Sequence, residues 1–133
     1  MAEEKSDIED ARDVRFLMGR FYPRIQEDGM LGEVFAAANV DWTEHIPAMC
    51  EFWEAVILRE GGYRGNAILP HVELDRRLQS GSFHGLRREE LNRWTSLFCH
   101  AVDELFSGPR AERAKHVAVT LAQQILMGIQ AES

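Results

Sequence analysis

Five histidines are the side chains of this sequence best suited to bind a metal or to transfer a proton near neutral pH. Any one of them taken alone is more often a surface or hydrogen-bonded core residue, and His84, His100 and His116 fit that interpretation. His45 and His71 differ because their neighbours are apolar. An imidazole on an apolar face costs free energy unless it is hydrogen-bonded or coordinates something. These two histidines are therefore the candidates for a binding site.

Tyr22 and Trp94 raise the same question, because each is set in an otherwise apolar stripe. A phenol and an indole can each donate a hydrogen bond. Taken singly, each is better explained as a core aromatic residue whose polar tip meets a backbone group. Neither residue by itself predicts a site.

Other kinds of chemistry lack the residues they need. Cys50 and Cys99 have neither a disulfide framework nor zinc-finger spacing around them, and neither lies in a nucleophile motif. The Glu-x-x-His repeats of di-iron bundles, a phosphate loop and a dinucleotide-binding glycine fingerprint are all missing from the sequence. Small basic clusters, such as Arg87 with Arg88, are explained by solvated helix faces.

Composition limits the class of protein. The chain has 133 residues and a net charge of −7, which disfavours a nucleic-acid partner. Its hydrophobic runs are short and its first residues are acidic, so we expect no membrane partner, no signal peptide and a cytoplasmic location with reduced thiols. We expect a single domain over 1–133, with a flexible N-terminus at 1–6 and a frayed C-terminus at 129–133.

Apolar residues recur at three- and four-residue steps, and no segment alternates with period two, so the sequence predicts an all-α protein. Ser6 and Glu9 resemble a capping box at the start of a first helix. That helix continues to Ile25, and Pro23 within it predicts a kink. Asp28 and the following glycine separate it from a short second helix.

The third helix contains a proline, which is tolerated best in the first turn of a helix. Pro47 therefore places its start between Glu44 and Ile46, with Trp42 in the lead-in. A loop follows at 61–66, and the sequence then predicts a short helix around His71. Two further helices contain Leu91 to Phe106, ended by Gly108-Pro109, and Ala111 to Ile125, with fraying past Gly128.

These residues resemble a known family, the truncated haemoglobins, and in particular group III of the two-over-two globins. The resemblance is specific through the joint order and spacing of several short elements. They are Phe21-Tyr22; Leu31 to Phe35; Trp42-x-x-His45 leading to Phe52-Trp53; Tyr63-x-Gly65-Asn66 leading to His71-x-x-Leu74; Arg93-Trp94-x-x-Leu97-Phe98; and Asp103-Glu104-Leu105-Phe106-x-Gly108. The resemblance implies a globin-like, truncated two-over-two helical sandwich around haem.

The family resemblance also assigns roles to individual residues. His71 corresponds to the proximal ligand of the iron in haem b, iron protoporphyrin IX. The distal ligand pocket would be formed by Tyr22, His45 and Trp94, together with Phe21. Apolar contacts to the cofactor would come from Phe21, Phe35, Met49, Phe52 and Trp53, and contacts to its propionates from Tyr63 and Arg64.

Three functions follow as alternatives. The first is a haem protein that binds dioxygen, nitric oxide or related small ligands, with polar distal donors that slow the release of oxygen. The second is a haem enzyme for nitric oxide dioxygenation or peroxidase-like oxidation, which needs a separate reductase because the chain carries no flavin or nicotinamide motif. The third is a haem-free helical interaction domain whose aromatic residues all belong to the core.

Overall fold

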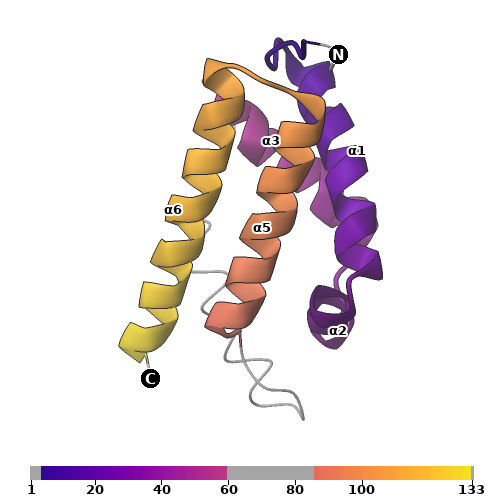
Figure 1. Cartoon of the computed structure of the whole chain (residues 1–133). Helices are drawn as coiled ribbons and strands as arrows, with labels where there is room; N and C mark the ends of the chain where they lie inside the picture. Colours follow the sequence, from indigo (N-terminus) through magenta and orange to yellow (C-terminus); the bar gives the residue numbers. More distant parts are fainter. Residues whose placement is uncertain (1–3, 60–85, 133) are drawn as a thin grey trace.

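A computed structural model describes residues 4–59 and 86–132 of the chain, which form five α-helices (Figure 1). Their bounds are α1 Ala11–Glu27, α2 Gly29–Ala38, α3 Trp42–Leu58, α5 Arg88–Leu105 and α6 Pro109–Glu132. The all-α prediction is confirmed. The loop expected at 61–66 and the short helix expected around His71 lie outside the described residues.

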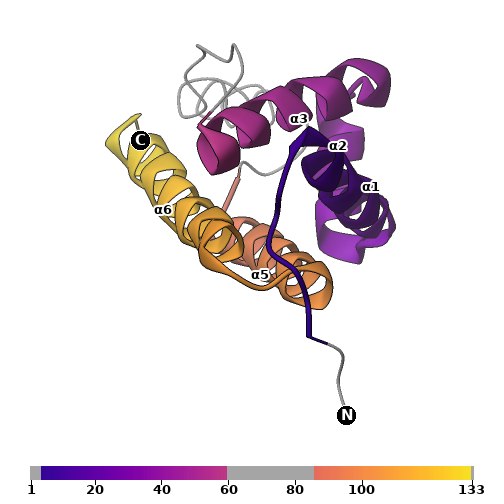
Figure 2. The ribbon, with the colours of Figure 1, turned by 90° about the horizontal axis from the view of Figure 1, so that it is seen from above.

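The helices form two packed pairs. Helix α1 packs against α3, and α5 packs against α6. The pairs contact each other through α1 with α5 and α3 with α6, and Figure 2 shows the helices from above. Helix α2 is short and closes one end, where it contacts α1 and α5. The expected two-over-two sandwich is therefore present. Within the described part of the chain, no helix is long and apolar enough to cross a membrane.

The apolar stripe predicted on the first helix is the buried face of α1. Val14, Leu17, Phe21 and Ile25 on this face are completely buried. The helix continues as a single element across Pro23, although this proline cannot donate the backbone hydrogen bond of a normal helix residue. The buried apolar face thus extends along α1 on both sides of the proline, from Val14 to Ile25.

The capping box expected at Ser6 and Glu9 is wrong. Helix α1 begins at Ala11, because the Asp10 carboxylate accepts hydrogen bonds from the backbone N–H groups of Arg12 and Asp13. Ser6 lies upstream of the helix, and its carbonyl oxygen accepts a hydrogen bond of 3.0 Å from the Ser107 N–H. An acidic N-cap one position before the helix therefore prevails over the Ser-x-x-Glu pattern.

The boundary between α1 and α2 lies where the sequence predicted it. The Asp28 N–H donates to the last turn of α1, and its side chain accepts from the Leu31 N–H at 3.0 Å, so one residue ends one helix and caps the next. Its other carboxylate oxygen receives the guanidinium of Arg93 on α5, with the shorter contact at 2.7 Å. The corner between the first two helices is thus tied to the second helix pair.

The expected start of the third helix is also wrong, since α3 begins at Trp42. The Asp41 carboxylate accepts hydrogen bonds from the Thr43 N–H at 3.0 Å and from the Thr43 hydroxyl at 2.6 Å. This cap fixes the helix start despite the proline, which deprives the Thr43 carbonyl of its usual donor. Trp42 therefore belongs to the first turn, and it lies on the same helix face as His45.

Candidate functional site

Two of the predicted distal residues meet at the corner formed by the first three helices. The rings of Tyr22 on α1 and His45 on α3 have centroids 5.4 Å apart at an interplanar angle of 85°. Phe35 on α2 lies 5.8 Å from the same imidazole. The imidazole is therefore bordered by aromatic rings from two other helices.

Tyr22 is buried, with only 2% of its surface exposed. Burial raises the pKa of its phenol far above the ordinary value, and the nearby Cys50 thiol acts in the same direction. The cause is the cost of placing a phenolate in a poorly solvated environment. The phenol consequently keeps its proton at every physiological pH and remains able to donate a hydrogen bond.

Trp94 joins the same aromatic cluster from α5. Its ring is 5.7 Å from Phe21 at 84°, and Phe21 lies 5.0 Å from the neighbouring Tyr22. On its other side Trp94 stacks against Phe98 at 5.4 Å and against Trp53 at 6.4 Å. The three polar aromatic residues are thus connected through packed rings, with Phe21 between Trp94 and the corner that holds the other two.

Helix α3 has two apolar faces. Cys50, Trp53 and Ile57 form the buried face, which packs on the rest of the sandwich. A second face contains His45, Met49, Phe52 and Val56 at three- and four-residue steps, and all four are half-buried. Trp94 and Leu97 on α5 are also half-buried. A stripe of half-buried apolar side chains beside residues that can donate hydrogen bonds is a candidate binding surface for an apolar ligand.

The predicted site residues fall into four groups. Tyr22 and Phe35 each contact His45, while Met49, Phe52 and Trp94 extend the half-buried apolar surface. Phe21 and Trp53 are buried in the core, and Trp53 stacks on Phe98 at 4.4 Å. The remaining predicted residues, His71, Tyr63 and Arg64, lie outside the described residues.

The histidines that the sequence assigned to ordinary positions agree with that interpretation where they are described. His100 on α5 is exposed, and its Nε2 lies 3.6 Å from the Glu104 carboxylate. His116 on α6 is exposed too.

The two cysteines are free thiols, and desolvation raises the pKa of each above its ordinary value. Both shifts favour the protonated thiol over the thiolate, which is the reactive form.

Trp42 is a member of the site that sequence reasoning missed. Its ring lies 5.7 Å from Tyr22 and 5.6 Å from His45. The signal was the three-residue spacing from Trp42 to His45, which places both on one helix face. It was obscured because Pro47 moved the expected helix start past the tryptophan.

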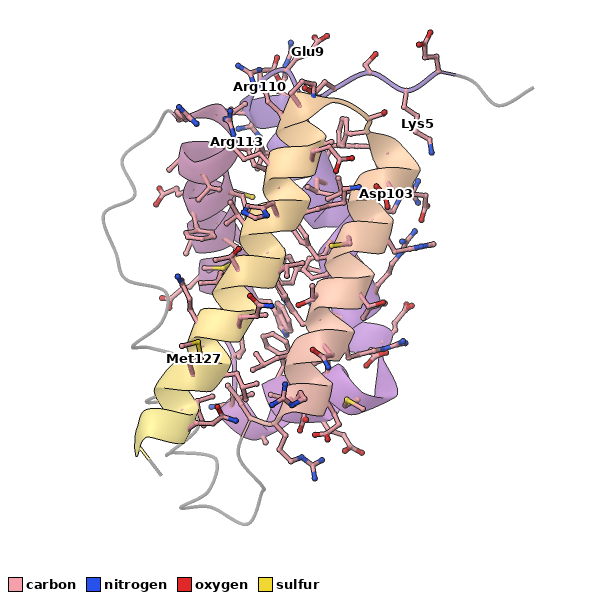
Figure 3. The ribbon with its side chains drawn as sticks, turned by 60° about the vertical axis from the view of Figure 1, so that its left-hand side comes forward. Lys5, Glu9, Asp103, Arg110, Arg113 and Met127 are labelled. Atoms are coloured by element: carbon pink, nitrogen blue, oxygen red, sulfur yellow. The ribbon has the colours of Figure 1, made fainter. Side chains whose placement is uncertain are left out.

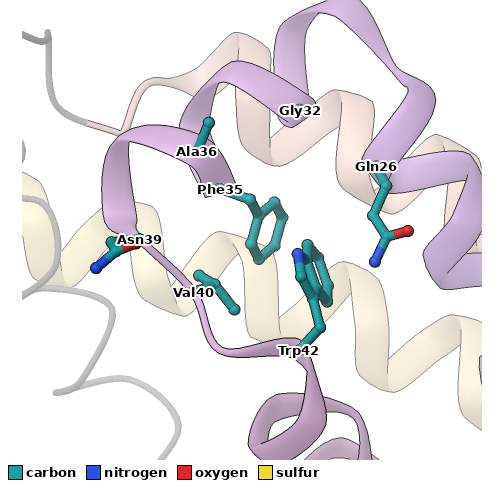
Figure 4. Close-up of a pocket in the computed structure, with 7 residues that line it drawn as sticks. All are labelled: Gln26, Gly32, Phe35, Ala36, Asn39, Val40 and Trp42. Atoms are coloured by element: carbon teal, nitrogen blue, oxygen red, sulfur yellow. The ribbon is translucent and has the colours of Figure 1, made fainter.

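A shallow hollow lies directly beside this corner (Figure 4). Phe35 and Trp42, whose ring centroids are 4.9 Å apart, line it together with Gln26 and residues at the end of α2. Helix α2 lies so close to α1 here that a Cβ atom added at Gly32 would be only 2.9 Å from the Gln26 carbonyl oxygen. The glycine is therefore required for the two helices to meet at this angle.

With the helix pairs and the aromatic corner defined, the chain can be compared with known proteins. It has the fold of a truncated haemoglobin: the crystal structure of the group III truncated haemoglobin from Campylobacter jejuni aligns with a TM-score of 0.69. That alignment covers 91% of this chain and 94% of the other, at 22% sequence identity.

The sequence comparison points to the same group. The chain is 27% identical over 113 residues to the group 3 truncated haemoglobin ctb of Campylobacter jejuni, covering 82% of this chain and 79% of that protein. No family model matches the chain. The resemblance to group III truncated haemoglobins that the sequence motifs indicated is therefore confirmed.

Proposed function

We propose that this chain is a globin-type haem protein that binds dioxygen and related diatomic ligands beside Tyr22, His45 and Trp94. The observation that supports the proposal most strongly is the aromatic corner in which Tyr22 and His45 meet, next to the half-buried face of α3. The similarity to group III truncated haemoglobins described above agrees with it.

The described residues fit a haem. A porphyrin presents flat apolar faces, and Met49, Phe52 and Val56 provide a continuous half-buried apolar surface one helix turn after another. In this proposal His71 holds the iron, and Tyr63 and Arg64 meet the propionates. When bound as haem b, the cofactor supplies an iron centre for small diatomic ligands.

The chain's own side chains determine how such a ligand is held. The Tyr22 O–H, the His45 imidazole N–H and the Trp94 indole N–H are each able to donate a hydrogen bond to a ligand that carries partial negative charge. One hydrogen bond to a charged group contributes about 1.5–3 kcal/mol, and each ~1.4 kcal/mol changes an affinity about tenfold. Two or three donors therefore predict slow release of dioxygen, with the surrounding rings excluding water.

Titration of the purified chain with hemin tests the proposal. We expect a Soret band that saturates at one haem per chain and that shifts when carbon monoxide is added to the reduced protein. His71→Gly should abolish or strongly shift this band. His116→Gly is the matched control, because His116 is exposed on α6. A chain that forms no Soret band would instead be a haem-free helical domain.

A further inference from the structure

Trp42 contacts both of the polar side chains that meet at the corner. Its centroid lies 5.7 Å from Tyr22 at 62° and 5.6 Å from His45 at 85°. Tyr22 and His45 are 5.4 Å apart. The three rings form a closed triangle of edge-to-face contacts, which aromatic groups favour.

Phe35 completes the surroundings of the imidazole. It lies 4.9 Å from Trp42 and 5.8 Å from His45. The His45 ring therefore has an aromatic neighbour from α1, another from α2 and a third from its own helix, one turn before it. A side chain bordered in this way has few rotamers open to it, so its position depends on those neighbours.

Beyond Trp42 there is open space rather than packed core. Phe35 and Trp42 line the hollow with Gln26 and Val40 (Figure 4), and the same indole lies 5.6 Å from the imidazole. Replacing the indole by a smaller side chain would leave room for His45 to turn away from Tyr22. The tryptophan is thus placed to act on the imidazole without itself belonging to the buried core.

We propose that Trp42 is a positioning residue, which holds the His45 imidazole against Tyr22 so that both side chains reach the same ligand. The expected effect of Trp42 on ligand release rests on the proposed haem function, whereas its effect on the orientation of the His45 ring does not. Trp42 acts through His45 and Tyr22, and no contact of its own with a ligand is required.

The test compares Trp42→Leu and Trp42→Phe with Val40→Ala, a control that lines the same hollow. Nuclear Overhauser cross-peaks between the ring protons of His45 and Tyr22 are recorded on the full chain in its diamagnetic carbon monoxide form. We expect Trp42→Leu to lose these cross-peaks, and Trp42→Phe and Val40→Ala to keep them. Dioxygen dissociation should become about tenfold faster in Trp42→Leu, as for a weakening of ~1.4 kcal/mol, and stay close to wild type in the other two.

The outcomes test two separate proposals, the positioning role of Trp42 and the haem function of the chain. Retained cross-peaks or an unchanged dissociation rate in Trp42→Leu would overturn the positioning role. Trp42→Met, whose flexible side chain fills irregular gaps, replaces the leucine variant if that variant does not fold. A chain that takes up no haem refutes the proposed function, and the cross-peaks of the chain as purified then test Trp42 independently.

Discussion

A single hydroxyl distinguishes the proposed role of Tyr22 from ordinary core packing. Tyr22 packs by its ring against Phe21, Trp42 and His45, and Phe preserves that ring. Tyr22→Phe should therefore leave the melting temperature nearly unchanged but accelerate dioxygen dissociation about 10- to 100-fold, the effect of one lost hydrogen bond to a charged group. Stopped-flow replacement of dioxygen by carbon monoxide measures the rate. An unaltered rate would remove Tyr22 from the ligand contacts.

Replacing a glycine by alanine should have opposite effects on stability at two positions, Gly108 and Gly19. Gly108 has φ of +146°, and a Cβ there would lie 2.5 Å from Asp7 Cγ. Gly108→Ala should cost about 1–3 kcal/mol through backbone strain alone, before the clash is added. Gly19 is exposed on α1, and a Cβ there would meet no described atom within 4 Å outside its own helix turn. Gly19→Ala should stabilise by about 0.5–1 kcal/mol.

Urea denaturation of the two variants measures both effects. The comparison controls for the alanine itself, since the same substitution is made twice. Equal changes in the free energy of unfolding would show that neither the positive φ nor the close approach to Asp7 is important for stability.

The residues of the candidate site were partly predictable from the sequence. Tyr22, His45 and Trp94 could be singled out because a polar group in an apolar stripe is visible in the sequence itself. Their grouping into one pocket came only from the family resemblance, and the contacts of Trp42 with Tyr22 and His45 came only from the structure, because residue spacing does not give the angle at which the helices meet. That angle is set by details such as the missing side chain of Gly32.

At the scale of elements, helix α6 is capped by a residue far away in the sequence. Its first residue is Pro109, and the residue before it is a glycine without a side chain to serve as a cap. The Asp7 carboxylate takes this role, accepting hydrogen bonds of 2.9 Å from the N–H groups of both Arg110 and Ala111. The negative charge also lies at the positive end of the helix.

The rest of the N-terminal segment holds Asp7 in place. The Arg110 guanidinium donates to the carbonyl oxygens of Ile8 and Glu9, and the Lys5 ammonium donates to the Asp103 carbonyl at 2.7 Å. Figure 3 shows Lys5, Glu9, Asp103 and Arg110 toward the end of the sandwich where α5 and α6 are joined. Ile8 is buried beneath it, with 1% of its surface exposed.

Removing this cap should destabilise the chain. Asp7→Ala should cost about 0.5–2 kcal/mol, the usual range for loss of an N-cap side chain. Glu9→Gln is the control, because Glu9 meets Arg110 through its backbone and its side chain is exposed. Thermal unfolding of both variants measures the difference. A control as unstable as Asp7→Ala would indicate a general effect of charge on this segment.

The same cap predicts how stability depends on pH. Partial burial acts to raise the pKa of Asp7, but the N–H donors of Arg110 and Ala111 outweigh it and leave the pKa below the ordinary value of 3.8. Because the carboxylate binds protons less readily in the folded chain, its contribution is complete above the unfolded pKa and is lost as the pH falls through the folded pKa. Asp7→Asn should therefore flatten the acid limb of the stability curve below about pH 4. An acid limb identical to that of wild type would contradict the cap.

The elements show where local sequence signals succeed and where they fail. The Asp28-Gly29 boundary was predictable, since one carboxylate ends α1 and caps α2 within three residues. The start of α1 was not, because Ser6 and Asp7 are engaged with Ser107 and the start of α6, about a hundred positions away. A local capping pattern carries no information about a partner that only the folded chain brings near.

At the scale of the whole molecule, polar contacts link the two helix pairs at several places. Arg24 on α1 binds Glu104 on α5 at 2.8 Å, and Arg93 binds Asp28 at the α1–α2 corner. On the other side, the Arg113 guanidinium on α6 donates to the Ile57 carbonyl in the last turn of α3, at 2.8 Å. These contacts fix the pairs at their ends, and aromatic packing fills the space between them.

A ligand that binds the half-buried apolar face of α3 should stabilise the whole folded chain. A ligand that binds only the folded state stabilises by about 2.7 kcal/mol when present at 100 times its dissociation constant. For a chain of this size that corresponds to a rise in melting temperature of about 10 °C. We therefore expect hemin, at a free concentration 100 times its dissociation constant, to raise the melting temperature by about this amount, with His71→Gly showing a much smaller rise. Circular dichroism at 222 nm follows both transitions, and equal melting temperatures with and without hemin would show that Met49, Phe52 and Val56 face something other than a porphyrin.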